Sequence, residues 1–320
     1  MSPTSLPIVS SLLLLASASA LQVGGVDPVG TPVGQSITLC RPQTDSAIVR
    51  FEDEKLEVAV RSALSIGENT DLTCNLVSNL ERLVADGVGI ENLNGIQNLT
   101  GLKHLDLWGN AVSDVSALAG LTSLAWLNIG NNAVADVSAL GGLTGLTFLQ
   151  IRENEIIDIS AIDGLTQLTE LDISYNNISD LSALSGMTRL TTLRVYNNPI
   201  TDISVMRGLT SLSELHVHDL PDLSSIQPLV ENTGLGKGDR VFLLGSNVPC
   251  SDIRALKDKG VPVRACVVES LLHWWWAILL AVGSTIFVTE FVSRRNERRW
   301  AAWRAAAQGQ SLEGSARDQL

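Results

Sequence analysis

Apolar residues recur along the middle of the chain with a period of 22 residues. In one copy leucine stands at positions 102, 105 and 107, and the next apolar position is Val112. The same positions return in the copies that start at Leu124, Leu146, Leu168 and Leu190. A period this regular predicts a repeat architecture, in which every unit stacks against its neighbours, instead of a single globular core.

Each copy predicts one short strand and one short helical turn. The Leu-x-Leu core favours a strand whose leucines point inward while the intervening side chains point to the opposite face. An asparagine follows the strand where the chain turns, and its amide can donate to and accept from backbone groups left unpaired there. An Asp-x-Ser triplet then offers a carboxylate to the first N–H groups of the turn. These asparagines form a structural ladder at Asn110, Asn132, Asn154, Asn176 and Asn198.

The motif LxxLxLxxNxI in a unit of 22 residues resembles the leucine-rich repeat, and the closing Asp-x-Ser to Gly-Leu-Thr segment looks like the bacterial internalin subtype. Five clean copies run from Leu102 to Ser211, and a degenerate copy starts at Leu80 and another at Leu212. The resemblance implies an α/β solenoid with a curved parallel sheet on its concave face and short helical turns on its convex face.

An open solenoid needs a cap at each end. Residues 51–64 have helical apolar spacing at Leu56, Val60 and Leu64, and resemble the helical cap that precedes many bacterial leucine-rich arrays. Residues 232–239 and 250–266 look like the closing unit, although Gly245-Ser246-Asn247 leaves the register of the last strand open.

Both ends of the chain carry membrane-related signals. An apolar stretch before Ala18-Ser19-Ala20 predicts a cleaved signal peptide. Ser270 to Thr289 has no formal charge and would span about 30 Å as a helix, which predicts one transmembrane helix. Three tryptophans, Trp274 to Trp276, lie at its start, where indole rings favour the membrane interface, and four arginines follow its end, so the positive-inside rule places the C-terminus in the cytoplasm. The repeats are then periplasmic or extracellular. As an alternative, the C-terminal segment resembles bacterial surface-sorting tags that are removed.

These features give a predicted domain order. It is a signal peptide (1–20), an N-terminal linker and helical cap (21–79), leucine-rich repeats (80–234), a C-terminal cap (235–269), a transmembrane helix (270–293) and a basic cytoplasmic tail (294–320).

Four cysteines flank or lie in the two caps. Behind a signal peptide an even number predicts disulfides, and the nearest pairing joins Cys40 to Cys74 and Cys250 to Cys266. The absence of a CxxC spacing disfavours a zinc site.

Composition and charge exclude several functional classes. The chain has 22 Lys and Arg against 34 Asp and Glu, a formal charge of −12, which disfavours a nucleic-acid partner. No nucleophile–base pair, phosphate loop or paired carboxylates stand out from the repeat, so we predict no enzyme and no cofactor. Glu214, His216 and His218 alternate in a row on one strand and do not converge on a metal ion.

The residues between the strand leucines predict a binding surface on the concave face. Trp126 and Phe148 occupy equivalent places in adjacent copies, about 5 Å apart, with Arg152 close by, which is the composition of an interaction hot spot. The predicted partner-binding residues are Trp108, Trp126, Asn128, Phe148, Gln150, Arg152, Glu170, Asp172, Arg194, Tyr196, Glu214 and His216. The sequence thus predicts a membrane-anchored protein that binds a macromolecule, most readily a protein. The rival hypothesis is an envelope or surface scaffold without a dedicated ligand.

Overall fold

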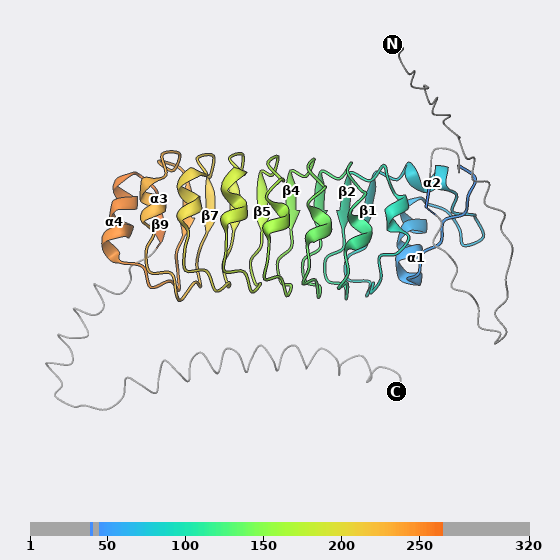
Figure 1. Cartoon of the computed structure of the whole chain (residues 1–320), viewed down its shortest axis with the longest axis horizontal. Helices are drawn as coiled ribbons and strands as arrows, with labels where there is room; N and C mark the ends of the chain where they lie inside the picture. Colours follow the sequence, from blue (N-terminus) through green and yellow to red (C-terminus); the bar gives the residue numbers. More distant parts are fainter. Residues whose placement is uncertain (1–38, 41–44, 265–320) are drawn as a thin grey trace, which may run out of the picture. The chain divides into compact units, whose positions relative to one another are not determined.

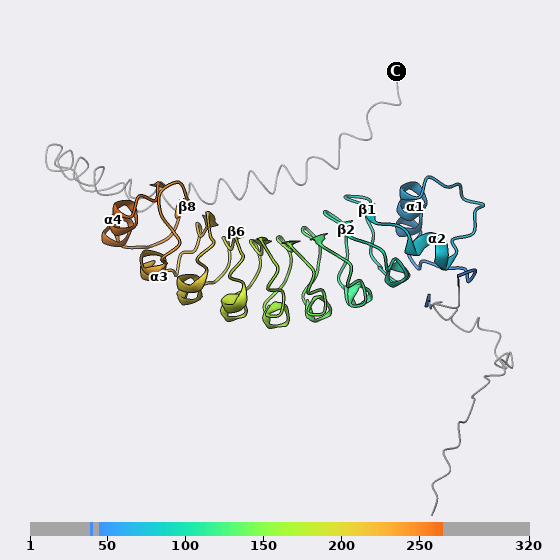
Figure 2. The same cartoon turned by 90° about the horizontal axis from the view of Figure 1, so that it is seen from above.

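The computed structural model describes residues 39–40 and 45–264, which form two compact units that divide between Ile156 and Ile157. Each unit repeats one pattern: a three-residue strand on one face, then a short helical turn on the opposite face (Figure 1, Figure 2). The alternation of strand and turn follows the 22-residue pattern, so the predicted repeat solenoid is confirmed at this level.

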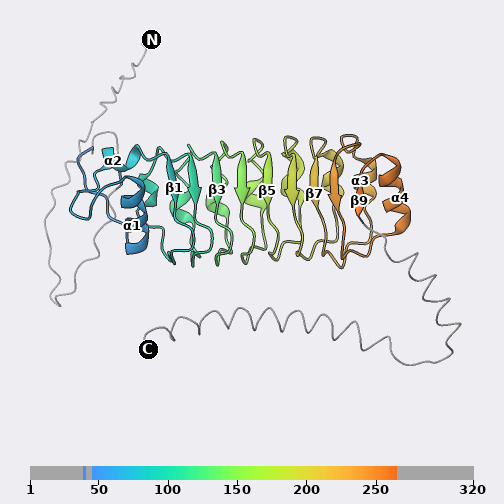
Figure 3. The same ribbon diagram turned by 180° about the vertical axis from the view of Figure 1, so that it is seen from behind.

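The first unit begins with helical segments and continues as a ladder of parallel strands. The strands pair in register with a constant offset, so that His104 lies opposite Trp126 and Trp126 lies opposite Phe148. Figure 3 shows these strands side by side. The elements are α1 (Glu54–Ala63), α2 (Cys74–Ser78), β1 (Arg82–Val84), a 3-10 helix (Ile96–Asn98), β2 (His104–Asp106), a 3-10 helix (Ser116–Leu118), β3 (Trp126–Asn128), a 3-10 helix (Ser138–Leu140) and β4 (Phe148–Gln150).

The second unit has the same pattern, but the number of residues between paired strand positions changes near its end. Glu214 of strand β7 (Glu214–His216) pairs with Arg240 of β8 (Arg240–Phe242), 26 residues further on, and β8 pairs in turn with β9 (Val263–Arg264). The strand ladder therefore extends into the residues that the sequence assigned to the C-terminal cap. The elements are a 3-10 helix (Ser160–Ile162), β5 (Glu170–Asp172), a 3-10 helix (Ser182–Gly186), β6 (Thr192–Arg194), a 3-10 helix (Ser204–Gly208), β7 (Glu214–His216), α3 (Gln227–Glu231), β8 (Arg240–Phe242), α4 (Cys250–Asp258) and β9 (Val263–Arg264).

The core of each unit lies between the strands and the helical turns. The central strand leucines Leu105, Leu127 and Leu149 of the first unit are completely buried, as are Leu171 and Leu193 of the second. Their strand neighbours on either side point away from this core, because side chains alternate along a strand. The inward set read from the sequence is therefore the observed core.

The asparagine ladder joins neighbouring repeats through hydrogen bonds. The Asn132 amide donates to the carbonyls of Leu107, Ile129 and Gly130, each at 3.0 Å, and its oxygen accepts from the Val112 N–H at 3.0 Å. Since both ends of the amide are occupied, the ladder stabilises the turn and offers no group to a ligand. Related bonds are made by Asn110, Asn154, Asn176 and Asn198.

The Asp-x-Ser triplets start the helical turns on the far face. Asp136 accepts a hydrogen bond from the Ser138 backbone N–H at 2.8 Å, and this bond, with one from the Ser138 side chain, lowers the pKa of Asp136. Four further triplets make the same bond, at Asp114, Asp158, Asp180 and Asp202.

Asp53 ties the first cap helix to the first repeat. One carboxylate oxygen caps α1 by accepting from the N–H groups of Lys55 (2.9 Å) and Leu56 (3.3 Å). The other accepts from Glu91 (2.8 Å) and Asn92 (3.2 Å). Burial by itself would raise the pKa of Asp53, but these four backbone donors outweigh it, and the pKa falls below its ordinary value.

Cys40 and Cys74 form a disulfide with 5.4 Å between their Cα atoms, the pairing expected from the sequence. Cys250 is disulfide-bonded, and its predicted partner Cys266 lies outside the described residues. The predicted signal peptide, transmembrane helix and cytoplasmic tail also lie outside them. Within residues 39–40 and 45–264, no helix combines the length and the apolar character needed to cross a bilayer.

Candidate binding surface

The strand face of each unit is the side of its strands that points away from the leucine core. Every repeat contributes two strand residues to it and a third residue just after the strand. Because the strands pair in register, equivalent side chains form rows that cross the strands at a spacing of about 4.8 Å. The sequence-predicted binding residues all occupy these rows.

The first row of the first unit is a stack of three rings. The centroids of His104 and Trp126 lie 3.9 Å apart and those of Trp126 and Phe148 lie 4.5 Å apart, with both pairs 9° from parallel. Stacked rings cover one another's faces, so their edges form the accessible part of an apolar ridge. The sequence placed Trp126 and Phe148 together, and the structure adds His104 to the stack.

The surroundings of His104 favour the uncharged form of its ring. Burial lowers its pKa, the nearby Arg82 guanidinium lowers it further, and Asp106 opposes these effects only in part. Within the described residues its Nε2 is buried and has no hydrogen-bond partner. In its uncharged form His104 extends the apolar ridge without adding a charge to it.

The third row is built around a glycine that makes room for an indole. A Cβ atom at Gly130 would lie 2.6 Å from Cε3 of Trp108, closer than such atoms approach, so only glycine lets this ring lie where it does. The Arg152 guanidinium lies 5.3 Å from the Trp108 ring centroid, within the range of a cation–π contact. Arg152 also pairs with Glu153. The first unit thus presents an indole and a guanidinium beside the aromatic ridge.

The middle row contains two of the predicted residues whose side chains are buried. Asn128 is only 7% exposed, because its amide donates to Asp106 at 3.0 Å and accepts from the Gly130 N–H at 3.0 Å. Asp172 of the second unit is 4% exposed and accepts from the backbone N–H and the hydroxyl of Ser174. Both side chains are used inside the fold, and neither is free to contact a partner.

A chain of ion pairs dominates the strand face of the second unit. Arg194 pairs with Glu170 at 2.5 Å and with Glu214 at 3.5 Å. Glu214 also pairs with Arg240 and lies 2.9 Å from His216 Nε2. The hydrogen bond from His216, together with Arg240 and Arg194, lowers the pKa of Glu214 despite its burial. These charges are largely paired with one another, so this surface presents little unpaired charge.

Aromatic rings border the ion pairs of the second unit. Tyr196 stacks on His218 at 4.1 Å and His216 stacks on Phe242 at 4.3 Å. Tyr175 meets Tyr196 edge-on at 5.3 Å. Phe242 and Arg240 were not identified from the sequence. Their strand β8 follows β7 after 26 residues, so a pattern with a period of 22 residues does not place them in the rows.

Tyr175 was missed for a different reason, which concerns backbone conformation. It occupies the turn position between strand and ladder asparagine, where φ is positive in every repeat, and it is 43% exposed. Gly, Asn and Asp adopt this left-handed conformation readily, whereas tyrosine adopts it at a cost. Its ring contacts that of Tyr196 in the next repeat. The equivalent residues are Gly87, Gly109, Asn131, Glu153, Asn197, Asp219 and Gly245.

The two units therefore each gather a set of predicted residues, but not all twelve. The first unit offers Trp108, Trp126, Phe148, Gln150 and Arg152, and the second offers Glu170, Arg194, Tyr196, Glu214 and His216. Across the part of the chain that the structure describes, no three His, Cys, Asp or Glu side chains are grouped to hold a metal ion.

A family model described as leucine-rich repeats in two copies matches residues 144–186 and 166–208. No curated protein matches the sequence. Among solved structures, internalin C2 from Listeria monocytogenes is 31% identical over 62% of this chain and 94% of its own, with a TM-score of 0.49. A leucine-rich repeat protein of Leptospira interrogans is 19% identical over 59% of this chain and 56% of its own, with a TM-score of 0.50.

Proposed function

Because the chain belongs to the leucine-rich repeat proteins, we propose that its repeats form a binding module that recognises a protein partner through the strand face. We further propose that it is of the internalin type, on the strength of the Asp-x-Ser and Gly-Leu-Thr signature and the 31% identity to internalin C2. In this proposal the module is a scaffold for binding and carries no catalytic activity.

The observation that carries the proposal is the aromatic ridge of the first unit. Trp126 and Phe148 are stacked and half-buried on the strand face, outside the leucine core. Aromatic side chains and arginine dominate the energetics of protein interfaces, because the partner buries apolar surface that is exposed to solvent in the free protein. Trp108 and Arg152 lie in the third row, four residues further along each repeat, and extend the same surface.

We predict that changing Trp126 and Phe148 together to alanine strongly weakens partner capture. Segment 21–269 would be immobilised, and the proteins it retains from surface and envelope extracts identified by mass spectrometry. The affinity for the retained partner should then fall by about 30-fold or more, the equivalent of about 2 kcal/mol. The loss of two stacked pairs, at about 0.5–1.5 kcal/mol each, should lower stability only moderately.

A matched control is Ile157→Ala, which removes a 67% exposed apolar side chain away from the strand rows. This variant should capture the partner normally. If the aromatic pair variant also captures it normally while remaining folded, the strand-face proposal fails. The rival, a structural scaffold without a ligand, instead requires that only changes to the caps or the core have an effect.

We propose that one C-terminal helix, residues 270–293, anchors the protein and leaves the repeats outside the cytoplasm. The proposal is motivated by the uncharged span and the arginines that follow it. Protease added to intact cells or spheroplasts should digest the repeats and spare an epitope placed after Arg299. Protection of the repeats would show the orientation to be wrong, and release of the repeats into the medium would favour a removed sorting tag.

A further inference from the structure

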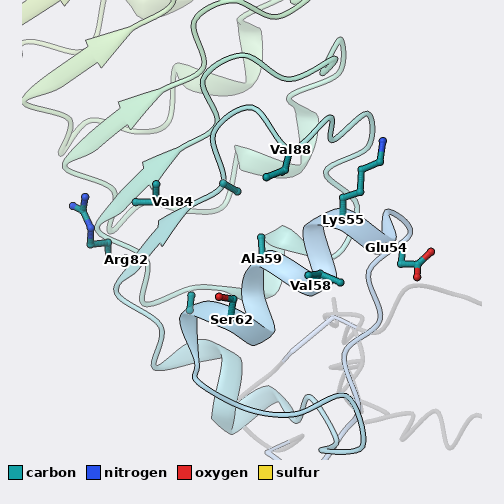
Figure 4. A pocket seen from close by; sticks show the side chains of 10 residues that line it. Glu54, Lys55, Val58, Ala59, Ser62, Arg82, Val84 and Val88 are labelled. Atoms are coloured by element: carbon teal, nitrogen blue, oxygen red, sulfur yellow. The ribbon is translucent and has the colours of Figure 1, made fainter. Parts of the chain in front are cut away.

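An open apolar groove separates the first cap helix from the first strand of the sheet. It has a volume of about 770 Å³ and is lined by Val58 and Ala59 of α1 and by Val84, Ala85 and Val88 of β1 and the loop after it (Figure 4). The three valines are 58%, 43% and 45% exposed, which is unusual for clustered apolar side chains in a soluble fold. Its charged lining residues are Glu54, Lys55 and Arg82.

The groove runs beside a strand edge that is open to pairing. β1 is terminal among the described strands, with β2 as its neighbour. The Glu81 carbonyl and the Ala85 N–H both bond to the β2 side. Since backbone groups alternate along a strand, those of Arg82 and Val84 point away from β2, toward the groove. An extended segment lying there would meet both apolar side chains and free backbone donors and acceptors.

The chain itself contains a segment that fits this description. After the predicted cleavage site, residues 21–36 read LQVGGVDPVGTPVGQS, with valine at 23, 26 and 29. A polyproline II helix has three residues per turn, so these valines would share one side of an extended chain, and the prolines and glycines favour that form over a regular helix or strand. Asp27 is the segment's single charged side chain, and it is opposite in sign to two of the three charged residues that line the groove, Lys55 and Arg82.

The segment is also long, and it is attached to the same unit that carries the groove. The described chain starts at Leu39, and Cys40 is bonded to Cys74, which begins α2 in the same unit. Residues 21–38 would extend over about 56 Å at 3.1 Å per residue, several times the length of the ten-residue α1. A tether of this kind gives a local concentration in the millimolar range, so a weak contact suffices for occupancy.

We propose that residues 21–36 of this chain occupy the groove between α1 and β1, with Val23, Val26 and Val29 against Val58, Val84 and Val88. The segment then completes the N-terminal cap and covers the open edge of β1. This proposal concerns the cap alone and does not depend on what the strand face binds.

The test places the photo-cross-linking residue p-benzoylphenylalanine at position 84 of the full-length protein and maps the products by mass spectrometry. We expect cross-links within one chain to residues 21–36. The same residue at position 58 provides a second probe if the first variant does not fold, and position 157, an exposed apolar site outside the groove, is the control that should not reach the segment.

A charge variant makes the test specific to the valine stripe. Changing Val23, Val26 and Val29 to aspartate should reduce the cross-link at least fivefold. The matched variant places aspartate at Gln22, Thr31 and Gln35, so it adds the same charge but leaves the three valines in place. It should retain most of the cross-link yield. Products at twice the chain mass, cross-links to the C-terminal tail, or none to residues 21–36 from either groove position would each overturn the proposal.

Discussion

Replacing Leu127 with alanine is expected to lower the free energy of unfolding by about 2–5 kcal/mol. Leu127 is completely buried at the centre of β3, between the equally buried Leu105 and Leu149 of the neighbouring strands. Alanine would remove its apolar contacts and leave a cavity that the rigid repeats on both sides fill poorly. Urea denaturation of segment 21–269, followed by circular dichroism, measures the change.

The control for this prediction lies in the same repeat. Thr122→Ala alters an exposed side chain five residues away and should shift stability by less than about 0.5 kcal/mol. Leu127→Ala should also leave partner capture intact at temperatures where the variant is folded, because the side chain does not reach the strand face. A shift as small as that of the control would contradict the assigned strand register.

The second large effect is expected at the asparagine ladder, where Asn132→Ala should cost about 3 kcal/mol. The change removes the amide that serves three carbonyls and the Val112 N–H, and each buried polar group left without a partner costs about 1–3 kcal/mol. Since these bonds join one repeat to the one before it, the unfolding transition should also broaden. Denaturant melts measured by both fluorescence and circular dichroism test both effects.

Two substitutions separate the ladder bonds from a general effect of losing an asparagine. Asn132→Asp keeps an acceptor for Val112 but loses the donors, so its cost should be intermediate. Asn131→Gly removes the neighbouring asparagine at a turn whose φ is 52°, where glycine is well accommodated, and should be nearly neutral. If Asn132→Ala behaved like Asn131→Gly, the ladder would contribute nothing to stability.

Much of the fold was predictable because one physical constraint repeats. In each repeat, leucines at alternate positions point inward and an asparagine follows at the turn. Together they determine where the strand lies, which residues form the core and how neighbouring strands pair, as Leu127 and Asn132 show. The rows of the strand face follow from the same register, which is why Trp126 and Phe148 could be placed side by side.

The remaining site features depend on contacts that no single repeat encodes. Burial of Asn128 results from its bond to Asp106 one strand away. The position of Trp108 requires the missing side chain at Gly130 in the next repeat. Arg240 joins the Glu214 ion pairs only because the chain takes a longer step into β8. Each of these features depends on a contact between residues of different repeats. The pattern within a single repeat therefore does not predict it.

The constant strand offset within the first unit has a consequence for how the gene can change length. Paired positions from β1 to β4 differ by one fixed number of residues. Duplication or loss of one whole repeat by recombination would therefore keep every leucine inward and every ladder asparagine at its turn, and would lengthen or shorten the strand face by about 4.8 Å. An insertion of any other length would have to be absorbed in a loop. The strand face of this unit can thus lengthen or shorten in whole repeats.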